Sequence, residues 1–283
     1  MSDNASGTSL DRVIDVLEAI VHDGHGTSLG DLSGRTGLTK PTAHRILHGL
    51  AQRGYAIRVG DGLYGPGPAV FTLASLALAT LDHATQAAPA MALLQEASGE
   101  TVHFALLQGQ SAVYVAKLES LHPYHLASAI GNRLALHSTS IGKAILAFLP
   151  DGKRGDVLAT LDLEPKTRRT ISSRDRLAAE LGLVRSTGYA IDDEENEDKV
   201  RCVGAAVFDH SGRVIGGLSV SAPAFHLTRI DAEALGPTVV AAGLVVSTRL
   251  GAAREALPPP YALADPGALL RPGGRYLGTR DGD

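Results

Sequence analysis

The sequence predicts an α+β fold in two parts, a small helical domain followed by a larger mixed domain. Apolar residues recur at helical spacing through residues 8–50, and a short hairpin signal follows them. From residue 101 onwards, hairpin patterns alternate with helical patterns. The chain has 283 residues, which is enough for two modest domains.

The composition is that of a globular protein that is acidic overall. Hydrophobic residues make up 44%, charged residues 20%, and the net charge is −4, which excludes a mainly disordered chain. The single cysteine, Cys202, excludes an intramolecular disulfide and a cysteine-rich zinc module. The apolar stretch from Ala69 to Leu81 is shorter than the roughly 20 residues of a membrane-spanning helix. Residues 1–7 lack the features of a signal peptide, so we expect a cytoplasmic protein that is not inserted in a membrane.

The N-terminal part is predicted to form three helices and a hairpin. Side chains that cap helix N-termini precede each helically spaced apolar run. An Asp-Gly turn between two short β-like runs predicts the hairpin. The expected elements are a disordered lead over 1–7, helices beginning at Thr8–Ser9, Ser28 and Thr39, the last ending near Arg53, and a hairpin turning at Asp61–Gly62, with a domain over 8–67.

The remaining chain is predicted to form a linker helix, a mixed domain and a tail. The segment from Ala69 to Leu81 is apolar nearly all round, so this helix must be buried, either in this chain or against a partner chain. Proline and glycine are frequent from Pro258 onwards, which is typical of flexible segments. The expected parts are a linker helix within 68–82, a mixed domain over 83–252 and a flexible tail over 253–283. Within the mixed domain we expect helices at about 85–98, 140–148, 151–161, 173–187 and 228–249, and strands at about 101–107, 112–118, 124–129, 200–208 and 213–221.

The third helix has a polar, partly basic face opposite an apolar one. At about 100° per residue, Ala43, Leu47 and Leu50 cluster on one side. Residues 32–60 contain five basic side chains and no acid, which makes a local electropositive patch. Helix, tight turn, helix and hairpin is the order of a winged helix-turn-helix, whose second helix enters the major groove of DNA. The candidate DNA-contacting residues are Thr39, Lys40, Pro41, Thr42, His44, Arg45 and His48.

Arg45 is the member of this set best suited to read a base, because arginine can donate two hydrogen bonds to a guanine edge. Thr42 or His44 could contact bases or phosphates. Asp61 stands at the tip of the hairpin, where a basic residue would bind phosphate better. The alternative left open by the pattern is a helical domain whose polar face is merely solvated.

A candidate cavity is expected beside two strands of the mixed domain. Ser219 and Ser221 lie two residues apart on one strand, so both hydroxyls face the same side. On the neighbouring strand, Cys202 shares a face with Gly204, which leaves room beside it. The start of the helix at Ser140 adds backbone N–H groups that favour an anion, so a small carboxylate would fit. The alternative is that the serines make local hydrogen bonds and the cysteine is a core residue.

Patterns of catalysis and metal binding are incomplete in this sequence. Gly142–Lys143 is followed by Ala144, without the earlier glycine of a phosphate-binding loop. Cys202 lies between apolar strand residues, which argues for an inert thiol. The acidic run 192–198 lacks the central glycine of a calcium loop, and we expect a solvated loop with Asp192 turned inward. We therefore expect no catalytic residue, no metal and no cofactor.

Four segments, in order, resemble the IclR family of bacterial transcription regulators. The segment from Leu29 to Tyr55, which contains TGLTKPTAHRIL, resembles the DNA-binding segment of that family. Three later segments resemble signatures of its effector-binding domain: GNRLALHSTSIGKA at 131–144, GYAIDDEE at 188–195 running on to Cys202, and GGLSVSAP at 216–223. The resemblance covers about residues 8–250. It implies an N-terminal winged helix-turn-helix, a linker helix and a C-terminal α/β domain with a GAF-like fold.

The resemblance also implies a function. It implies a DNA-binding transcriptional regulator, a repressor rather than an activator, whose binding to double-stranded operator DNA is modulated by a small organic or aromatic acid. It further implies a homodimer, with a dimer of dimers as the larger assembly. Because Asp192 would repel a carboxylate, we expect an acid that also carries a hydroxyl or carbonyl group. The effector-binding residues carried over by motif are Ser140, Ile141, Asp192, Cys202, Ser219 and Ser221, with His103 and His137 within possible reach.

Two hypotheses from other functional classes remain open at this point. The first is a small-acid-processing enzyme that uses Cys202, which turnover of an acid without specific DNA binding would favour. The second is a protein-interaction module that uses the apolar helix at 69–81, which monomeric and DNA-blind behaviour of residues 1–82 would favour.

Overall fold

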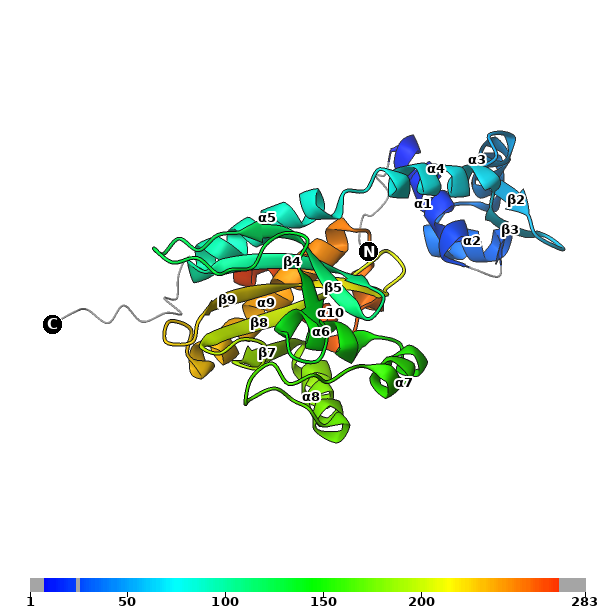
Figure 1. The fold of residues 1–283 in the computed structure, drawn as a ribbon. Coiled ribbons are helices and arrows are strands. Elements are labelled where there is room, and N and C mark those ends of the chain that lie inside the picture. The colour runs from blue at the N-terminus through cyan, green and yellow to red at the C-terminus, as the bar shows by residue number, and fades with distance from the viewer. Residues whose placement is uncertain (1–7, 24–25, 270–283) are drawn as a thin grey trace. The chain divides into compact units, whose positions relative to one another are not determined.

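The computed structural model describes residues 8–23 and 26–269, which form two compact units, one up to Leu81 and one from Asp82 onwards (Figure 1). The predicted lead over 1–7 and the end of the predicted tail lie outside the described residues. The fold class predicted from the sequence, a helical part followed by a mixed α/β part, is confirmed.

The first unit is a helix-turn-helix with a small antiparallel sheet. Thr8 caps the first helix and Ser28 the second through side-chain oxygens that accept backbone N–H groups. Val16, Ile20 and Leu47 form part of the buried core between the three helices. The elements are α1 (Ser9–His22), β1 (Thr27–Ser28), α2 (Leu29–Thr36), α3 (Lys40–Gln52), β2 (Ala56–Arg58) and β3 (Leu63–Pro66), with strand order β1-β3-β2. The two-residue strand β1 was not predicted, because it is too short to show alternation.

Helix α4 (Pro68–Ala79) closes the first unit and buries none of its residues. Its apolar side chains are largely exposed, with Phe71 at 63%, Leu73 at 59% and Leu76 at 63%. The expectation that this helix must be buried is therefore not met within the described chain. The alternative that remains is burial against a partner chain.

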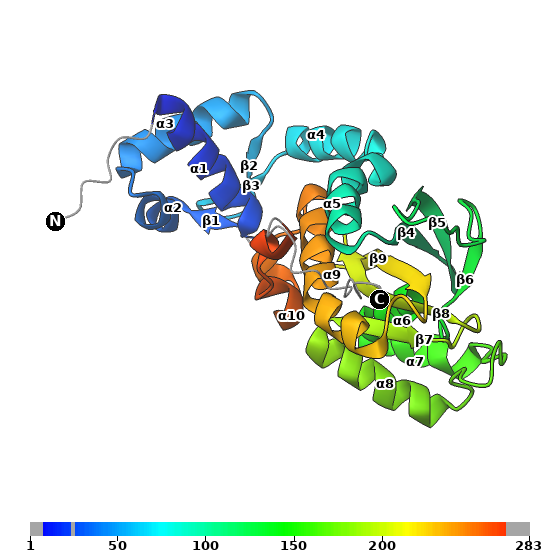
Figure 2. The same ribbon diagram turned by 90° about the vertical axis from the view of Figure 1, so that its left-hand side faces the viewer.

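The second unit is built on a six-stranded antiparallel sheet with helices on both faces (Figure 2). The strands, in the order β6-β5-β4-β9-β8-β7, are β6 (Arg133–Ala135), β5 (Ser111–Leu118), β4 (Thr101–Gln108), β9 (Val214–Pro223), β8 (Val200–Phe208) and β7 (Tyr189–Asp193). The helices are α5 (His83–Ser98), α6 (Ser140–Phe148), α7 (Asp151–Thr160), α8 (Arg174–Thr187) and α9 (Arg229–Arg249). Helix α6 packs against β7, β8 and β9, and helix α8 packs against α6. Helices α5 and α9 pack together, α5 against β4 and α9 against β8.

Helix α9 is the core helix of this unit. Thr228 and Asp231 form a capping box at its start. Among the described helices it is the one long and apolar enough to span a membrane by length and hydropathy alone. However, 67% of its most apolar 18-residue stretch is buried inside the protein. The burial of its apolar residues against β8 accounts for this composition, since a helix that is apolar nearly all round belongs in a core.

One predicted strand is absent, and two observed strands were not predicted. The strand expected from Tyr124 to Ala129 is absent, because the amino group of Lys117 binds the carbonyl oxygens of Leu126 (3.0 Å) and Ser128 (2.7 Å) in an irregular segment. Strands β6 and β7 were not predicted. Both are short, and β7 runs into the acidic residues that suggested a loop.

The C-terminal segment was predicted to be a flexible tail, and over residues 254–269 this is wrong. Short helices form at η1 (Arg254–Ala256), α10 (Pro259–Ala262) and η2 (Pro266–Leu269). Tyr261 is fully buried, and its ring packs edge-to-face against Phe148 and Phe208, with ring centroids 5.3 and 4.8 Å away. The segment is therefore part of the core of the second unit.

Candidate DNA-binding helix and effector cavity

Helix α3 presents the polar face that the sequence predicted. Ala43, Leu47 and Leu50 are buried at 0%, 1% and 8% exposure, so the opposite side of the helix faces outward. Thr39 is the N-cap residue, and its hydroxyl lies 3.0 Å from that of Thr42, which is half-buried. The other members of the predicted set are exposed: Thr39, Lys40, Pro41, His44, Arg45 and His48.

The positive charge around α3 is accessible to a polyanion. The basic residues of the stretch 32–60 are all exposed, and the Arg58 guanidinium lies over the ring of Tyr64, 5.8 Å from its centroid. Asp61 is exposed at the tip of the β2–β3 hairpin, as the sequence indicated. An exposed basic helix with a short hairpin beside it can contact both phosphates and base edges.

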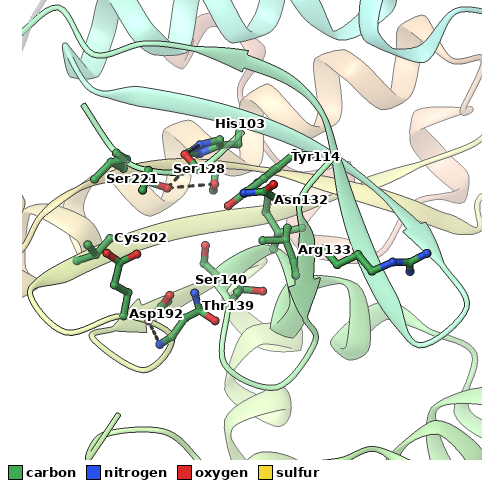
Figure 3. A pocket seen from close by; sticks show the side chains of 18 residues that line it. His103, Tyr114, Ser128, Asn132, Arg133, Thr139, Ser140, Asp192, Cys202 and Ser221 are labelled. Carbon is green, nitrogen blue, oxygen red and sulfur yellow. Dashed lines mark hydrogen bonds between the residues drawn. The ribbon is translucent and has the colours of Figure 1, made fainter. Parts of the chain in front are cut away.

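A cavity of about 240 Å³ lies on the face of the large sheet that carries the start of α6 (Figure 3). It takes residues from all six strands of the large sheet, the start of α6, the irregular segment at 126–132 and the acidic run after β7. All six residues carried over by motif line it: Ser140, Ile141, Asp192, Cys202, Ser219 and Ser221.

The register of the sheet explains why the strand residues meet. Cys202 pairs with Ser221 and Gly204 with Ser219 across β8 and β9, and the two serine hydroxyls lie 3.4 Å apart. A Cβ atom on Gly204 would lie 2.9 Å from the Ser140 hydroxyl and 3.1 Å from the Ile141 nitrogen. Glycine at this position therefore allows the start of α6 to approach the sheet and close one side of the cavity.

The start of α6 supplies backbone donors to the cavity wall. Thr139 is the N-cap residue, and its hydroxyl accepts the N–H of Gly142 at 3.1 Å. The N–H groups of Ser140 and Ile141 belong to the first turn, which has no intrahelical acceptor for them. Both residues line the cavity, so this end of the helix favours the negative end of a ligand.

His103 joins the serine pair on the opposite wall. Its Nε2 lies 2.8 Å from the Ser128 hydroxyl and its Nδ1 lies 3.4 Å from the Ser221 hydroxyl. Its ring stacks on Tyr114, with centroids 4.4 Å apart. Burial, together with the charge of Lys117, lowers the pKa of His103 to about 3, so the ring is neutral at physiological pH.

His137, a candidate from the sequence, and Arg133, which lines the cavity, both direct their polar groups elsewhere. His137 does not line it, and its Nε2 lies 3.0 Å from the carbonyl oxygen of Glu164. Figure 3 shows the Arg133 side chain extending away, and its Nη1 donates to the Ser111 hydroxyl at 2.7 Å. With His103 neutral, the donors that the described residues offer a ligand are uncharged ones.

Asp192 is only 3% exposed, and its Oδ1 accepts the N–H groups of Glu195 (2.7 Å) and Asn196 (3.2 Å). Burial, and then the nearby Glu195 carboxyl, raise the pKa of Asp192 to about 7. The expectation that Asp192 repels a carboxylate assumed an ionised group. The structure revises it, because the carboxyl group is substantially protonated near neutral pH.

The acidic run is not a simple solvated loop. Its first two residues, Asp192 and Asp193, belong to strand β7, and Glu195 is 7% exposed. The fully buried amine of Lys143 explains this, since its Nζ donates to Glu195 Oε1 at 2.5 Å and to the carbonyl oxygen of Ile191 at 2.6 Å. This buried ion pair holds the acidic run, whose residues Asn196 and Glu197 line the cavity, against α6.

Cys202 is half-buried, and its setting does not activate a thiolate. Burial, and then the charge of Asp192, raise the pKa of its thiol well above the usual value. Sequence reasoning missed other lining residues, including Tyr114, Ser128, Asn132 and Asn196. Tyr114 lies on a correctly predicted strand, so alternation could have indicated it, whereas Ser128 fell in the wrongly predicted strand.

Comparisons with known proteins agree with this architecture. The model of the IclR helix-turn-helix domain matches residues 9–60, and the model of the bacterial transcriptional regulator IclR C-terminal domain matches residues 75–248. The chain is 34% identical over 224 residues to the HTH-type transcriptional regulator KdgR of Dickeya chrysanthemi, covering 79% of this chain and 73% of KdgR. It is 30% identical over 249 residues to the transcriptional repressor IclR of Escherichia coli (strain K12), covering 87% and 91%.

A solved structure has the same fold over most of its length. The crystal structure of a putative ICLR transcriptional regulator from Silicibacter sp. TM1040 superposes with a TM-score of 0.77 at 28% identity, covering 90% of this chain and 99% of that one. The family consists of transcriptional regulators and not enzymes, which removes the hypothesis of an acid-processing enzyme using Cys202. The chain therefore belongs to the IclR family of bacterial transcriptional regulators and is a DNA-binding helix-turn-helix regulator.

Proposed function

We propose that this regulator is a repressor whose operator binding is modulated by a small organic or aromatic acid held in the cavity of the second unit. The observation that carries the proposal is the meeting of three serine hydroxyls, a helix N-terminus and a buried carboxyl group around one cavity. Relatives at 30% identity and above include three named as repressors, which supports that sign of regulation.

The donors of the cavity fit an anionic group. The hydroxyls of Ser140, Ser219 and Ser221 and the first N–H groups of α6 can all donate to a carboxylate. Asp192 donates to a carbonyl oxygen when protonated and accepts from a hydroxyl when ionised. The proposed ligand is therefore an acid that carries a hydroxyl or carbonyl group at its other end.

The size of the cavity fits a small ligand. A cavity of roughly 150 Å³ holds benzene. At about 240 Å³, this cavity has room for roughly ten non-hydrogen atoms. That range includes short oxo-acids, hydroxy-acids and single-ring aromatic acids.

On the DNA side, we infer that α3 enters the major groove with its N-terminal half. The residues proposed to contact DNA are Thr39, Lys40, Pro41, Thr42, His44, Arg45 and His48. Binding at paired half-sites requires paired helix-turn-helix domains, so a homodimer is part of the proposal, with a dimer of dimers as the larger assembly.

The test of the cavity is a Ser219→Ala/Ser221→Ala double variant. A thermal-shift screen of small organic acids first finds an acid that stabilises the wild-type protein. Calorimetric titration of that acid into the double variant should then show affinity lower by roughly 1–3 kcal/mol per lost charged hydrogen bond. Operator affinity without the acid should change little, because the serines lie in the second unit.

The matched control is Ser186→Ala, which removes an exposed serine hydroxyl on α8. It should leave the affinity for the acid unchanged. Unchanged affinity in the double variant would show that Ser219 and Ser221 do not line the effector site, and the assignment of the cavity would be wrong.

A further inference from the structure

A second cluster of potential ligand groups lies outside the cavity, at one end of the large sheet. Glu100 directly precedes β4, His122 follows β5, and His226 follows β9. Because β4 is antiparallel to both neighbouring strands, the start of β4 lies beside the ends of β5 and β9. Nδ1 or Nε2 of each histidine and a carboxylate oxygen of Glu100 all lie within 4.8 Å of one another.

The buried carboxylate is the unusual member of the cluster. The Glu100 side chain is fully buried, and a buried carboxylate needs a cation or several donors. Among the described residues, its ion-pair partners are His226, with Nδ1 2.6 Å from Oε1, and His122, with Nε2 3.7 Å from Oε1. Within the part of the chain that the structure describes, no lysine or arginine forms an ion pair with Glu100.

We propose that Glu100, His122 and His226 form a binding site for a divalent transition metal ion of the zinc class. Two imidazole nitrogens and one carboxylate oxygen are a ligand set that such ions prefer. Metal–ligand bonds of about 2.0–2.1 Å place tetrahedral ligand atoms about 3.3 Å apart. The observed separations of 2.6 and 3.7 Å lie on either side of that value, so small side-chain movements complete the site.

The surroundings support a ligand site in two further ways. Gly99 makes room for the His122 ring, because a Cβ atom there would lie 3.1 Å from His122 Nε2. The hydroxyl of Tyr124 donates to the second carboxylate oxygen of Glu100, as outer-shell groups do when they orient a metal-binding carboxylate. His122 and His226 are 36% and 30% exposed, which gives an ion a path from solvent and leaves a coordination position for water.

The site has a consequence for the neighbouring cavity. His122 and Tyr124 lie in the connection between β5 and β6, and later residues of this connection, Leu126 and Ser128, line the cavity. A metal that joins His122 to the start of β4 and the end of β9 fixes one end of this segment. The ion therefore has a structural role that is separate from effector recognition.

The experiment is calorimetric titration of Zn²⁺ into the full chain after treatment with a chelator. We expect one saturable site per chain, and Co²⁺ in place of Zn²⁺ should show the visible absorption of a four-coordinate site. His122→Ala and His226→Ala should each weaken Zn²⁺ binding by more than about 100-fold, and Tyr124→Phe by about 10- to 100-fold. Far-UV circular dichroism of each metal-free variant confirms that it remains folded.

The matched control is His125→Ala, which removes an exposed histidine of the same segment outside the cluster. It should keep wild-type Zn²⁺ affinity. Absence of saturable binding in the wild-type protein would overturn the proposal. The same holds if wild-type affinity persists in both His122→Ala and His226→Ala, because the metal would then bind elsewhere.

Discussion

At the scale of single residues, the burial of Asp192 has a consequence for stability. Its pKa is raised from 3.8 to about 7 in the folded protein, first by burial and then by Glu195. The folded state therefore holds the proton more tightly than the unfolded state does. The stability that this group contributes is fully present below about pH 4 and is lost as the pH rises towards 7.

We predict that Asp192→Asn becomes more stabilising as the pH rises. The asparagine oxygen can still accept the N–H groups of Glu195 and Asn196, but it carries no charge to bury. The change in the free energy of unfolding should be more favourable at pH 8.5 than at pH 5.5 by up to about 2 kcal/mol. Denaturant unfolding of both proteins at the two pH values measures it. A difference that does not vary with pH would show that Asp192 ionises normally in the folded state.

Arg45 carries the prediction on sequence recognition. It is exposed on the face of α3 opposite Leu47, so Arg45→Ala should leave folding intact. The loss of a bidentate base contact should cost about 1–3 kcal/mol of operator affinity and less on random DNA. Fluorescence anisotropy with both duplexes at one salt concentration measures the ratio. An equal loss on the two duplexes would make Arg45 a phosphate contact instead.

At the scale of elements, helix α10 completes the sheet where β7 begins. Strand β7 starts with Tyr189 paired to Ala205. Just beyond that pair, the Tyr261 hydroxyl accepts the N–H of Ala206 (2.6 Å) and donates to the carbonyl oxygen of Gly188 (2.8 Å). A side chain from the C-terminal segment thus satisfies backbone groups that a longer β7 would have paired.

We predict that Tyr261→Phe destabilises the protein by about 1–3 kcal/mol, because it leaves two buried backbone groups without a partner. Denaturant unfolding followed by circular dichroism measures the change. Tyr189→Phe is the matched control, since its hydroxyl makes no hydrogen bond among the described residues. A stability loss in Tyr261→Phe no larger than in the control would mean that the C-terminal segment is not part of the cooperative core.

The elements also show what sequence reasoning can and cannot find. Long runs with clear periodicity were placed within a few residues, as for α3, α6 and the β8–β9 hairpin. The failures are segments whose structure depends on distant partners. The irregular segment at 124–129 follows from the Lys117 amine, and the order of residues 254–269 follows from the ring pocket around Tyr261.

For the candidate cavity too, local periodicity predicted some features, whereas others depend on residues far away in the sequence. The alternation of Ser219 and Ser221 on one strand was enough to predict their common face, and the register with β8 then brings Cys202 beside them. The protonation state of the Asp192 carboxyl group could not be predicted, because its pKa depends on burial and on Glu195. That burial in turn depends on Lys143, which lies about fifty residues earlier in the chain.

At the scale of the whole molecule, the exposed apolar side chains of α4 set the expected assembly. Phe71, Leu73 and Leu76 are each about 60% exposed on one helix, within a unit whose other helices bury an apolar core. An exposed helix that is apolar nearly all round is typical of an interface with another protein chain. Paired half-sites in DNA require a second helix-turn-helix domain, so a second copy of this chain is the partner we expect.

We predict that a Phe71→Glu/Leu76→Glu double variant is monomeric at micromolar concentration, where the wild-type protein is at least a dimer. Burying the new carboxylates without partners would cost more than the remaining apolar contacts return, while each chain still folds because α4 contributes no buried residue. Analytical ultracentrifugation gives the assembly state, and operator affinity should fall with it, since a monomer binds only one half-site. Leu183→Glu, which places one such carboxylate on a leucine of α8 that is also 63% exposed, should leave both properties unchanged. A double variant that remains dimeric would show that the interface lies elsewhere than α4. A wild-type protein that is a stable monomer at this concentration would contradict the predicted dimer.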